Sequence, residues 1–289
     1  MNENTSVSRQ KTTINTLQFK KRQHEVISML TAYDYPTALA LDRVGIDAIL
    51  VGDSLGMVVL GYQSTLPVTM DEMLHHCRAV SRGAEYALLI GDMPFLSYQA
   101  SADDAVLNAG RFLKEAGMDA VKLEGGSERC ENIRKIVEAG IPVMGHLGLT
   151  PQSVNQLGGY RAQGKSLDSA VRLIEDAERI QEAGCFSIVL ESIPDRLAEL
   201  ITQRLDIPTI GIGAGVGCDG QVLVAHDVLG MYDKFSPKFS KRYKNLLKEM
   251  ENGFHNYIEE VQEKSFPSDA HVFKIQDDVW EQLLKIIRS

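Results

Sequence analysis

The sequence contains few cysteines and no long apolar run, and these absences narrow the kinds of protein it can encode. The four cysteines show neither CxxC spacing nor the density of a disulfide scaffold, so we expect free thiols and a reducing, cytoplasmic environment. No apolar run reaches the roughly 18 residues of a membrane-spanning helix. The first 22 residues are polar with scattered charge, unlike a secretory signal peptide.

The chain also lacks an excess of positive charge. Its net charge is -9, which argues against a general nucleic-acid binder or a membrane-surface protein. Hydrophobic residues make up 44% and charged residues 24% of the 289 residues, which is ordinary for a soluble globular protein. A chain of this length can bury a large core without disulfides, and we expect one domain over residues 1–289.

Short apolar runs alternate with longer helical patterns between residues 27 and 227. We expect strands at 27–34, 48–54, 87–94, 120–126, 142–149, 185–192, 207–215 and 221–227. The segments between most of them have helix signals, such as the Ser101 cap and the closing Gly117 of one segment. Eight such units over roughly 200 residues predict an α/β fold, a closed (β/α)8 TIM barrel. An open, doubly wound sheet is the alternative.

The two ends of the chain depart from this alternation. Residues 13–23 are expected to form a short helix that precedes the first strand and plugs the bottom of the barrel. Residues 238–262 and 277–289 have amphipathic patterns, which predict the final barrel helix and a C-terminal extension. The barrel core and the helical extension are therefore expected at about 24–250 and about 251–289.

Four of the apolar strands end in an acid. Asp53, Asp92, Glu124 and Glu191 each lie at a C-terminal strand end, and in a parallel barrel those ends open onto the face where barrel enzymes place their chemistry. Four carboxylates converging there would repel one another unless a cation lies among them. Oxygen ligands favour Mg2+, Mn2+ or Ca2+ over zinc. The alternative for any single acid is an N-cap of the following helix.

The order of the strands indicates a role for each acid. Mg2+ usually takes one or two protein carboxylates, so Asp53 and Asp92, which follow the same Gly-Asp turn on adjacent strands, are the expected direct ligands. Glu124 is expected to bind the ion directly or through water. Glu191 lies about half a barrel from Asp53, and a partly desolvated carboxylate there could act as a general base.

Three more residues near the strand ends could complete the site. Lys122 precedes Glu124 by two residues, so both side chains point to the same side of the strand; it would pair with an acid of the chain or with a bound carboxylate. Ser54 could bind a substrate carboxylate or cap a helix. His146 could polarise a carbonyl or be a satisfied core residue. The Gly- and Gln-rich loop at 150–165 is expected to be a lid or a plain surface loop.

Several stretches are similar to a known family. "VGDSLGMVVLGYQSTLPVTMDEM", "GDMPF", "VKLEGG", "GHLGLTPQSVNQLGGYRAQG" and "IVLESIP" resemble the 3-methyl-2-oxobutanoate (ketopantoate) hydroxymethyltransferases, over roughly residues 13–273. The resemblance implies a (β/α)8 enzyme that uses Mg2+, a 2-oxoacid and 5,10-methylenetetrahydrofolate. It implies formation of 2-dehydropantoate in pantothenate biosynthesis through a Mg2+-stabilised enolate, by a cytoplasmic homo-oligomer that is often a decamer.

The resemblance also assigns roles to particular residues. Those matched to metal binding are Asp53, Asp92 and Glu124. Those matched to substrate contacts are Asp53, Ser54, Asp92 and Lys122. Those matched to catalysis are Glu191 as the proton acceptor, Lys122 and His146. The end of the chain, from "KIQDDVWEQ" onward, is an extension that the resemblance does not cover.

Two other functions remain open. A Mg2+-dependent 2-oxoacid C–C lyase or mutase of the isocitrate lyase or phosphoenolpyruvate mutase type would share the barrel and the acidic site. Such enzymes carry a "KKCGH"-like catalytic cysteine loop, which this sequence does not contain. A barrel kept as a non-catalytic binding protein is the other alternative, and it would not need the complete set of residues at the strand ends.

Overall fold

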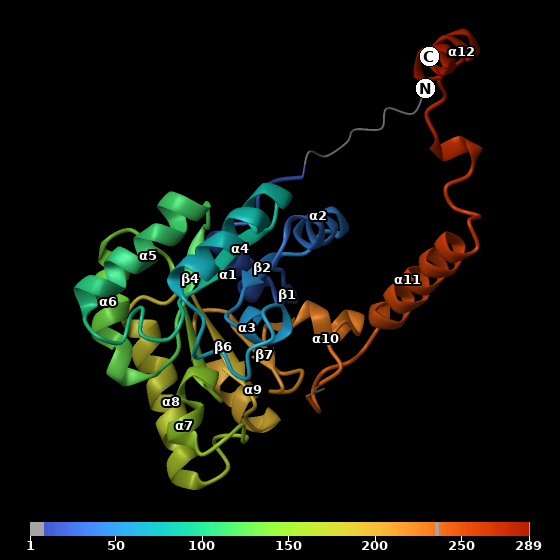
Figure 1. The fold of residues 1–289 in the computed structure, drawn as a ribbon. Helices are drawn as coiled ribbons and strands as arrows, with labels where there is room; N and C mark the ends of the chain where they lie inside the picture. The colour runs from blue at the N-terminus through green and yellow to red at the C-terminus, as the bar shows by residue number, and fades with distance from the viewer. Residues whose placement is uncertain (1–8, 235–236, 289) are drawn as a thin grey trace, which may run out of the picture.

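The computed structural model describes residues 9–234 and 237–288, and within them eight parallel strands close into a barrel in chain order (Figure 1). The strands are β1 (Ile27–Thr31), β2 (Ala48–Val51), β3 (Leu88–Asp92), β4 (Ala120–Lys122), β5 (Val143–Gly148), β6 (Ser187–Glu191), β7 (Thr209–Ile212) and β8 (Gly220–Leu223). β1 pairs with both β2 and β8, which closes the barrel. The predicted TIM barrel is confirmed, and the open sheet is wrong.

Helices cover the outside of most of the barrel. The helices of the described residues, including those that do not cover the barrel, are α1 (Ile14–Gln23), α2 (Tyr35–Val44), α3 (Leu55–Val58), α4 (Met70–Gly83), α5 (Ala102–Ala116), α6 (Cys130–Glu138), α7 (Val154–Leu157), α8 (Leu167–Glu182), α9 (Asp195–Arg204), α10 (Ala225–Leu229), α11 (Leu246–Gln262) and α12 (Asp277–Ile287). Single 3-10 turns lie at Ser127–Arg129, Pro151–Ser153 and Asp269–His271. Of the helices in the described part of the chain, none combines the length and the apolar character needed to cross a membrane.

Helix-capping residues lie at the ends of α4 and α5 and make capping hydrogen bonds there. Ser101 caps α5 by accepting a hydrogen bond from the backbone N–H of Asp104, and Gly117 ends the helix in the left-handed conformation. Thr69 and Glu72 form a reciprocal capping box at the start of α4. These bonds satisfy N–H groups of a first helical turn, which have no partner within the helix.

Apolar strand residues fill two cores, one inside the barrel and one between the strands and the helices. Leu17 of α1 is fully buried in the inner core, together with Met29 of β1, so α1 plugs the barrel as expected. The outer core is packed tightly enough to demand glycine at one position. A Cβ on Gly91 of β3 would lie 2.3 Å from Cδ1 of Phe112 on α5.

The outer face beside β1 and β8 is the exception to this covering. Ser28 of β1 and Gln221 of β8 are exposed, whereas β2, β3 and β4 are buried along their whole length. Residues 213–219 contain no helix between β7 and β8, and only the short α10 follows β8 directly. This part of the barrel therefore lacks the helix that completes the outer ring elsewhere.

α11 does not supply that helix, contrary to the expectation for residues 238–262. It extends away from the barrel together with α12 (Figure 1), and its side chains are exposed from Lys248 onward. Two backbone bonds explain the direction. The N–H of Tyr243 donates to the carbonyl of Val228, and the N–H of Leu247 donates to the carbonyl of Gly230. They tie the start of α11 to α10, so the chain leaves the barrel there.

Candidate functional site

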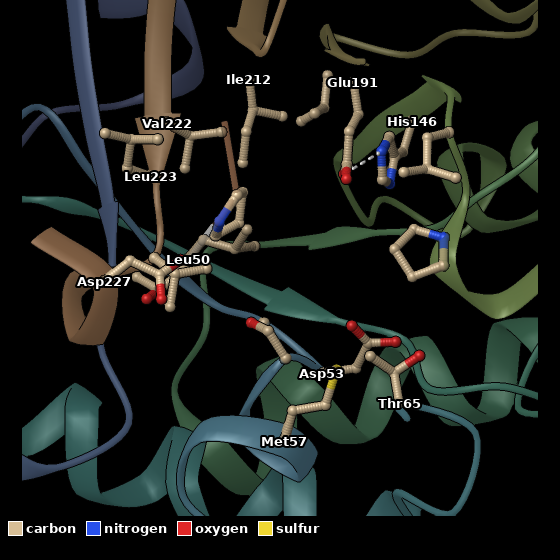
Figure 2. A pocket seen from close by; sticks show the side chains of 18 of the residues that line it. Leu50, Asp53, Met57, Thr65, His146, Glu191, Ile212, Val222, Leu223 and Asp227 are labelled. Atoms are coloured by element: carbon tan, nitrogen blue, oxygen red, sulfur yellow. Dashed lines mark ion pairs between the residues drawn. The ribbon is translucent and has the colours of Figure 1, made fainter. Parts of the chain in front are cut away.

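All seven residues expected at the site line one cavity of about 630 Å³, at the C-terminal end of the strands. They are Asp53, Ser54, Asp92, Lys122, Glu124, His146 and Glu191. The strand register brings them together. Asp92 of β3 is paired with Lys122 of β4, and Glu191 of β6 is paired with Gly148 of β5. Figure 2 shows Asp53 on one side of this cavity and the pair formed by Glu191 and His146 on another.

None of the four acids caps the helix that follows it. The N-cap residues of those helices are Ser54, Ser101, Gly126 and Pro194. Ser54 occupies an N-cap position, yet its side chain makes no capping bond; its Oγ lies 2.8 Å from the hydroxyl of Tyr33. The helix-cap alternative is therefore wrong for the four acids and for the Ser54 hydroxyl.

Two buried cations are interleaved with the acids. Lys122 Nζ lies 2.8 Å from Asp92 Oδ1. His146 lies between two carboxylates, with Nδ1 3.3 Å from Glu124 Oε1 and Nε2 3.1 Å from Glu191 Oε2 (Figure 2). Lys122 Nζ is also 3.3 Å from His146 Nδ1. The imidazole thus joins the acid that follows β4 to the acid that ends β6.

Burial and repulsion disturb the protonation of the two aspartates. Burial, and then the charges of Asp92 and Glu124, raise the pKa of Asp53 well above its ordinary value, against a smaller opposing effect of Lys122. Burial also raises the pKa of Asp92, although Lys122 opposes it. One lysine is therefore not enough to compensate the acids, and a further positive charge would stabilise their ionised forms.

The histidine is held in its charged form by its neighbours. Burial and the charge of Lys122 would lower the pKa of His146, but hydrogen bonds to Glu124 and Glu191 outweigh them and raise it to about 9. Burial would raise the pKa of Glu124, and the hydrogen bond and charge of His146 instead bring it below its ordinary value. The two neighbouring carboxylates therefore favour the charged form of His146.

Asp53 and Asp92 offer oxygen ligands to a hard dication. The backbone N–H of Asp53 donates to Asp92 Oδ2 at 3.1 Å, so the two residues are in direct contact. Asp92 Oδ1 is buried and already has a cationic partner, the Lys122 ammonium at 2.8 Å. Asp53 Oδ1 receives no hydrogen bond from the described residues, and its side chain lines the cavity. The raised pKa values of both aspartates indicate that Lys122 alone does not compensate them, so the residues fit Mg2+.

Glu124 is less available as a direct ligand. Its Oε1 contacts His146, and its Oε2 accepts a hydrogen bond from the backbone N–H of Gln152 at 3.0 Å. Among the residues that the structure describes, no three His, Cys, Asp or Glu side chains are arranged to hold one metal ion. Mg2+ does not need three, because it commonly takes one or two carboxylates and completes its shell with water and substrate oxygens.

The loop at 150–165 contributes to the cavity, as the lid prediction requires. Pro151 and Tyr160 line the cavity, and Gln152 contacts the acids directly. Sequence reasoning placed this loop at the mouth but did not identify Gln152 as a member of the site. The one available signal was its position three residues after the end of the predicted fifth strand.

The remaining wall of the cavity is mostly apolar. Ile212 and Val222, from the ends of β7 and β8, face the space together with Phe239 (Figure 2 labels the first two). Asp227 of α10 is the acid on this wall, and burial raises its pKa to about 6 against the opposing charge of Arg242. The cavity therefore has an ionic side and an apolar side.

Comparison with known proteins gives consistent matches over nearly the whole chain. A family model described as ketopantoate hydroxymethyltransferase matches residues 11–269. The 3-methyl-2-oxobutanoate hydroxymethyltransferase of Clostridium novyi (strain NT) is 58% identical over 273 residues, which cover 94% of this chain and 99% of the relative. The enzyme of the same name from Syntrophus aciditrophicus (strain SB) is 59% identical over 263 residues, covering 91% and 97%. α12 lies beyond the matched range of the family model.

Solved structures with a similar fold are distant in sequence. A phosphonopyruvate hydrolase in complex with oxalate and Mg2+ has a TM-score of 0.59 at 11% identity, covering 96% of this chain and 97% of that one. A 2,3-dimethylmalate lyase of the phosphoenolpyruvate mutase and isocitrate lyase superfamily has a TM-score of 0.57 at 14% identity, covering 95% of each chain. At these identities the likeness shows the barrel fold alone.

Proposed function

The chain belongs to the ketopantoate hydroxymethyltransferase family, and on that premise we propose that its cavity transfers a hydroxymethyl group from 5,10-methylenetetrahydrofolate to 3-methyl-2-oxobutanoate. The product would be 2-dehydropantoate, an intermediate of pantothenate biosynthesis. The observation that most directly supports this is the gathering of the four strand-end carboxylates with Lys122 and His146 on one side of a single cavity. Such a set can bind an anionic 2-oxoacid and move a proton beside its ketone.

Mg2+ is the proposed cation, with Asp53 and Asp92 as its direct ligands and Glu124 acting through water. The cavity-lining Oδ1 of Asp53, to which the described residues direct no hydrogen bond, supports this choice, as does the engagement of both Glu124 oxygens by protein donors. Bound there, Mg2+ would polarise the 2-oxo group of the substrate and stabilise negative charge that develops on its oxygen.

Lys122 and Ser54 are proposed to hold the substrate carboxylate. Lys122 is a buried ammonium whose pKa is raised because the attraction of Asp92, Glu124 and Asp53 outweighs burial, which would lower it. The hydroxyl of Ser54 is oriented by Tyr33 at 2.8 Å. A fixed ammonium and a fixed hydroxyl would orient the substrate so that C3 faces the proton acceptor.

Glu191 is the proposed proton acceptor. It would break the C3–H bond of the 2-oxoacid and take the proton, while His146 keeps the carboxylate in place through the 3.1 Å contact of Nε2. C3 would then form a bond to the methylene carbon of the folate. Cleavage of the methylene–nitrogen bonds, with water supplying the hydroxyl oxygen, would release the product and tetrahydrofolate. The loop at 150–165 would limit bulk water during these steps.

Exchange of the C3 proton in heavy water, with Mg2+ and the 2-oxoacid but no folate, tests this assignment. Glu191→Gln should lower the exchange rate by roughly 100-fold or more, because the proton acceptor is removed, while calorimetry should show Mg2+ affinity within about two-fold of the wild type. Glu182→Gln, on the exposed end of α8, is the matched control and should exchange normally. Wild-type exchange in Glu191→Gln would contradict the role of Glu191, and an inert wild type would contradict the proposed reaction.

A homo-oligomer, of the decamer type or smaller, is proposed as the working form. The uncovered face beside β1 and β8 supports it, as do the exposed apolar side chains of α11, which include Phe254 and Ile258. The cytoplasm is the proposed compartment, supported by the four free and buried cysteines. Cell fractionation checks the compartment, and recovery outside the soluble cytoplasmic fraction would contradict it.

A further inference from the structure

Gln152 connects two of the proposed metal-site acids to the loop at 150–165. It is buried in the 3-10 turn Pro151–Ser153, shortly after β5. Its backbone N–H donates to Oε2 of Glu124 at 3.0 Å, and its side-chain Nε2 donates to Oδ2 of Asp53 at 3.0 Å. One neutral residue therefore touches acids that belong to two different strand ends.

The orientation of the Gln152 amide follows from its partners. Nε2 donates to the carbonyl oxygen of Met93 at 2.9 Å, which can only accept, as well as to Asp53. Oε1 accepts from the hydroxyl of Tyr98 at 2.7 Å and from Nε2 of Gln99 at 3.2 Å. Because both amide hydrogens and the amide oxygen are engaged, the side chain cannot turn over without losing several bonds.

Tyr98 ties the same network to the backbone that carries Glu124. Its hydroxyl accepts a hydrogen bond from the N–H of Glu124 at 3.0 Å while donating to Gln152 Oε1 at 2.7 Å. The side chain of Tyr98 is 1% exposed, so packing fixes its position. Gln152 therefore holds Asp53 and Glu124 from a rigid support.

The hydrogen bond to Asp53 also determines which of its oxygens a ligand can reach. Gln152 occupies Oδ2, and the described residues direct no hydrogen bond at Oδ1 of this cavity-lining side chain. A lysine in the place of Gln152 would neutralise the carboxylate, and a glutamate would add a further repelling charge. A primary amide fixes the carboxylate and leaves its negative charge in place to attract a cation.

From these contacts we infer that Gln152 is a positioning residue, which aims Asp53 and Glu124 at a bound divalent cation without touching the ion. This inference rests on the proposed function, because it takes the acids to be the Mg2+ site. Partners that orient metal ligands commonly change metal affinity by about 10–100-fold when they are removed. The 3-10 turn at the start of the loop at 150–165 would therefore help to hold the metal-binding acids in place.

The test is a calorimetric titration of the full chain with Mg2+ alone, in the absence of both substrates. Gln152→Met keeps the length of the side chain and removes its amide, so we expect the Kd for Mg2+ to rise by about 10–100-fold. Gln156→Met is the matched control, since Gln156 lies on the same loop and is exposed. Its Kd should match that of the wild type.

A purely structural role would give a different pattern. It would lower the folded fraction and the maximal rate of C3 proton exchange but leave the Mg2+ concentration for half-maximal exchange unchanged. A positioning role raises that concentration and restores exchange to within about three-fold of the wild type at saturating Mg2+. Tyr98→Phe removes the hydroxyl that holds both the Gln152 amide and the backbone of Glu124, and we expect a smaller rise in Kd, of about two- to five-fold. If Gln152→Met does not fold, an unchanged Kd in Tyr98→Phe overturns the role of this network in aiming the two acids.

The outcomes separate this inference from the proposed function. A Kd for Gln152→Met within two-fold of the wild type overturns the positioning role while the proposed reaction stands. A raised Kd for Gln152→Met, together with a wild-type chain that transfers no hydroxymethyl group, supports the positioning role and contradicts the reaction. A wild-type chain that binds no Mg2+ overturns both.

Discussion

Lys122 and Asp53 lie in the same buried cluster, and replacing them should change the stability of the metal-free protein in opposite directions. Lys122 supplies a cation to a group of acids that exceeds it in charge. Lys122→Met keeps an unbranched side chain and removes that cation. Asp53→Asn keeps the shape of the carboxylate and removes one of the repelling charges. In EDTA, the first substitution should destabilise the fold and the second should stabilise it.

The contact between Lys122 and Asp92 sets the size of the first effect. At 2.8 Å, and with an effective dielectric constant of about 20, the attraction between the two charges is about 6 kcal/mol. Desolvation offsets part of it, and removing one partner of a buried pair typically costs about 3–5 kcal/mol. We expect Lys122→Met to lose an amount in this range at pH 8, where the lysine is charged in both the folded and the unfolded chain.

The direction of the stability change in Asp53→Asn follows from the protonation of Asp53. Burial and its neighbours raise the pKa of Asp53 in the folded state, so the folded chain binds this proton more tightly than the unfolded chain does. Stability is then lost as pH rises through the interval between the ordinary pKa and the folded one. This loss occurs in the wild type and is absent in Asp53→Asn, so at pH 8 the variant should be more stable.

Urea unfolding followed by far-ultraviolet circular dichroism measures both effects. Tryptophan fluorescence is unsuitable, because Trp280 lies on α12 outside the barrel. Lys114→Met on α5 is an exposed control and should change stability by about 0.5 kcal/mol or less. Saturating Mg2+ should narrow the deficit of Lys122→Met, because a dication replaces part of the lost charge, and should remove the advantage of Asp53→Asn. A loss below about 1 kcal/mol for Lys122→Met, or a less stable Asp53→Asn in EDTA, would refute this electrostatic account.

Two further predictions concern the opposite wall and the assembly. Burial raises the pKa of Asp227 from its ordinary value to about 6, so the folded chain holds this proton more tightly, and the resulting stability is lost as pH rises from about 4 through about 6. The full pKa shift corresponds to about 3 kcal/mol, which we reduce to about 1 kcal/mol for a partly solvated group. Urea unfolding at pH 4 and pH 7 should show that the free energy of unfolding depends less on pH in Asp227→Asn than in the wild type. An equal pH dependence in the two proteins would contradict this prediction. Sedimentation should give a mass well above the 31.9 kDa of one chain. Phe254→Glu combined with Ile258→Glu on α11 should lower that mass, and a monomeric wild type would contradict the oligomer.

Much of the site follows from the sequence because of a property of parallel barrels. A continuous apolar run predicts a strand buried on both faces, and helical segments between such runs require the strands to be parallel. All C-terminal strand ends then lie on one face. An acid at the end of a run, such as Asp53 or Glu191, is thereby placed at the cavity without knowledge of any distance. The N-terminal plug and the helix caps follow from equally local patterns.

Other features depend on which distant segments meet. The bond from Gln152 to Asp53 joins residues 99 positions apart, and no local pattern distinguishes Gln152 from the exposed Gln156 four residues later. The course of α11 is a similar case, because its amphipathic pattern fits a barrel helix and two backbone bonds to α10 direct it elsewhere.

The sequence by itself determined the parallel barrel and the face on which the acids gather, since both depend on the order and period of apolar runs along the chain. The tertiary structure alone decided how those acids are paired, with His146 between Glu124 and Glu191 and Lys122 beside Asp92. The physical reason is the short range of hydrogen bonds and buried ion pairs, which form only where packing brings separate strand ends within about 3 Å.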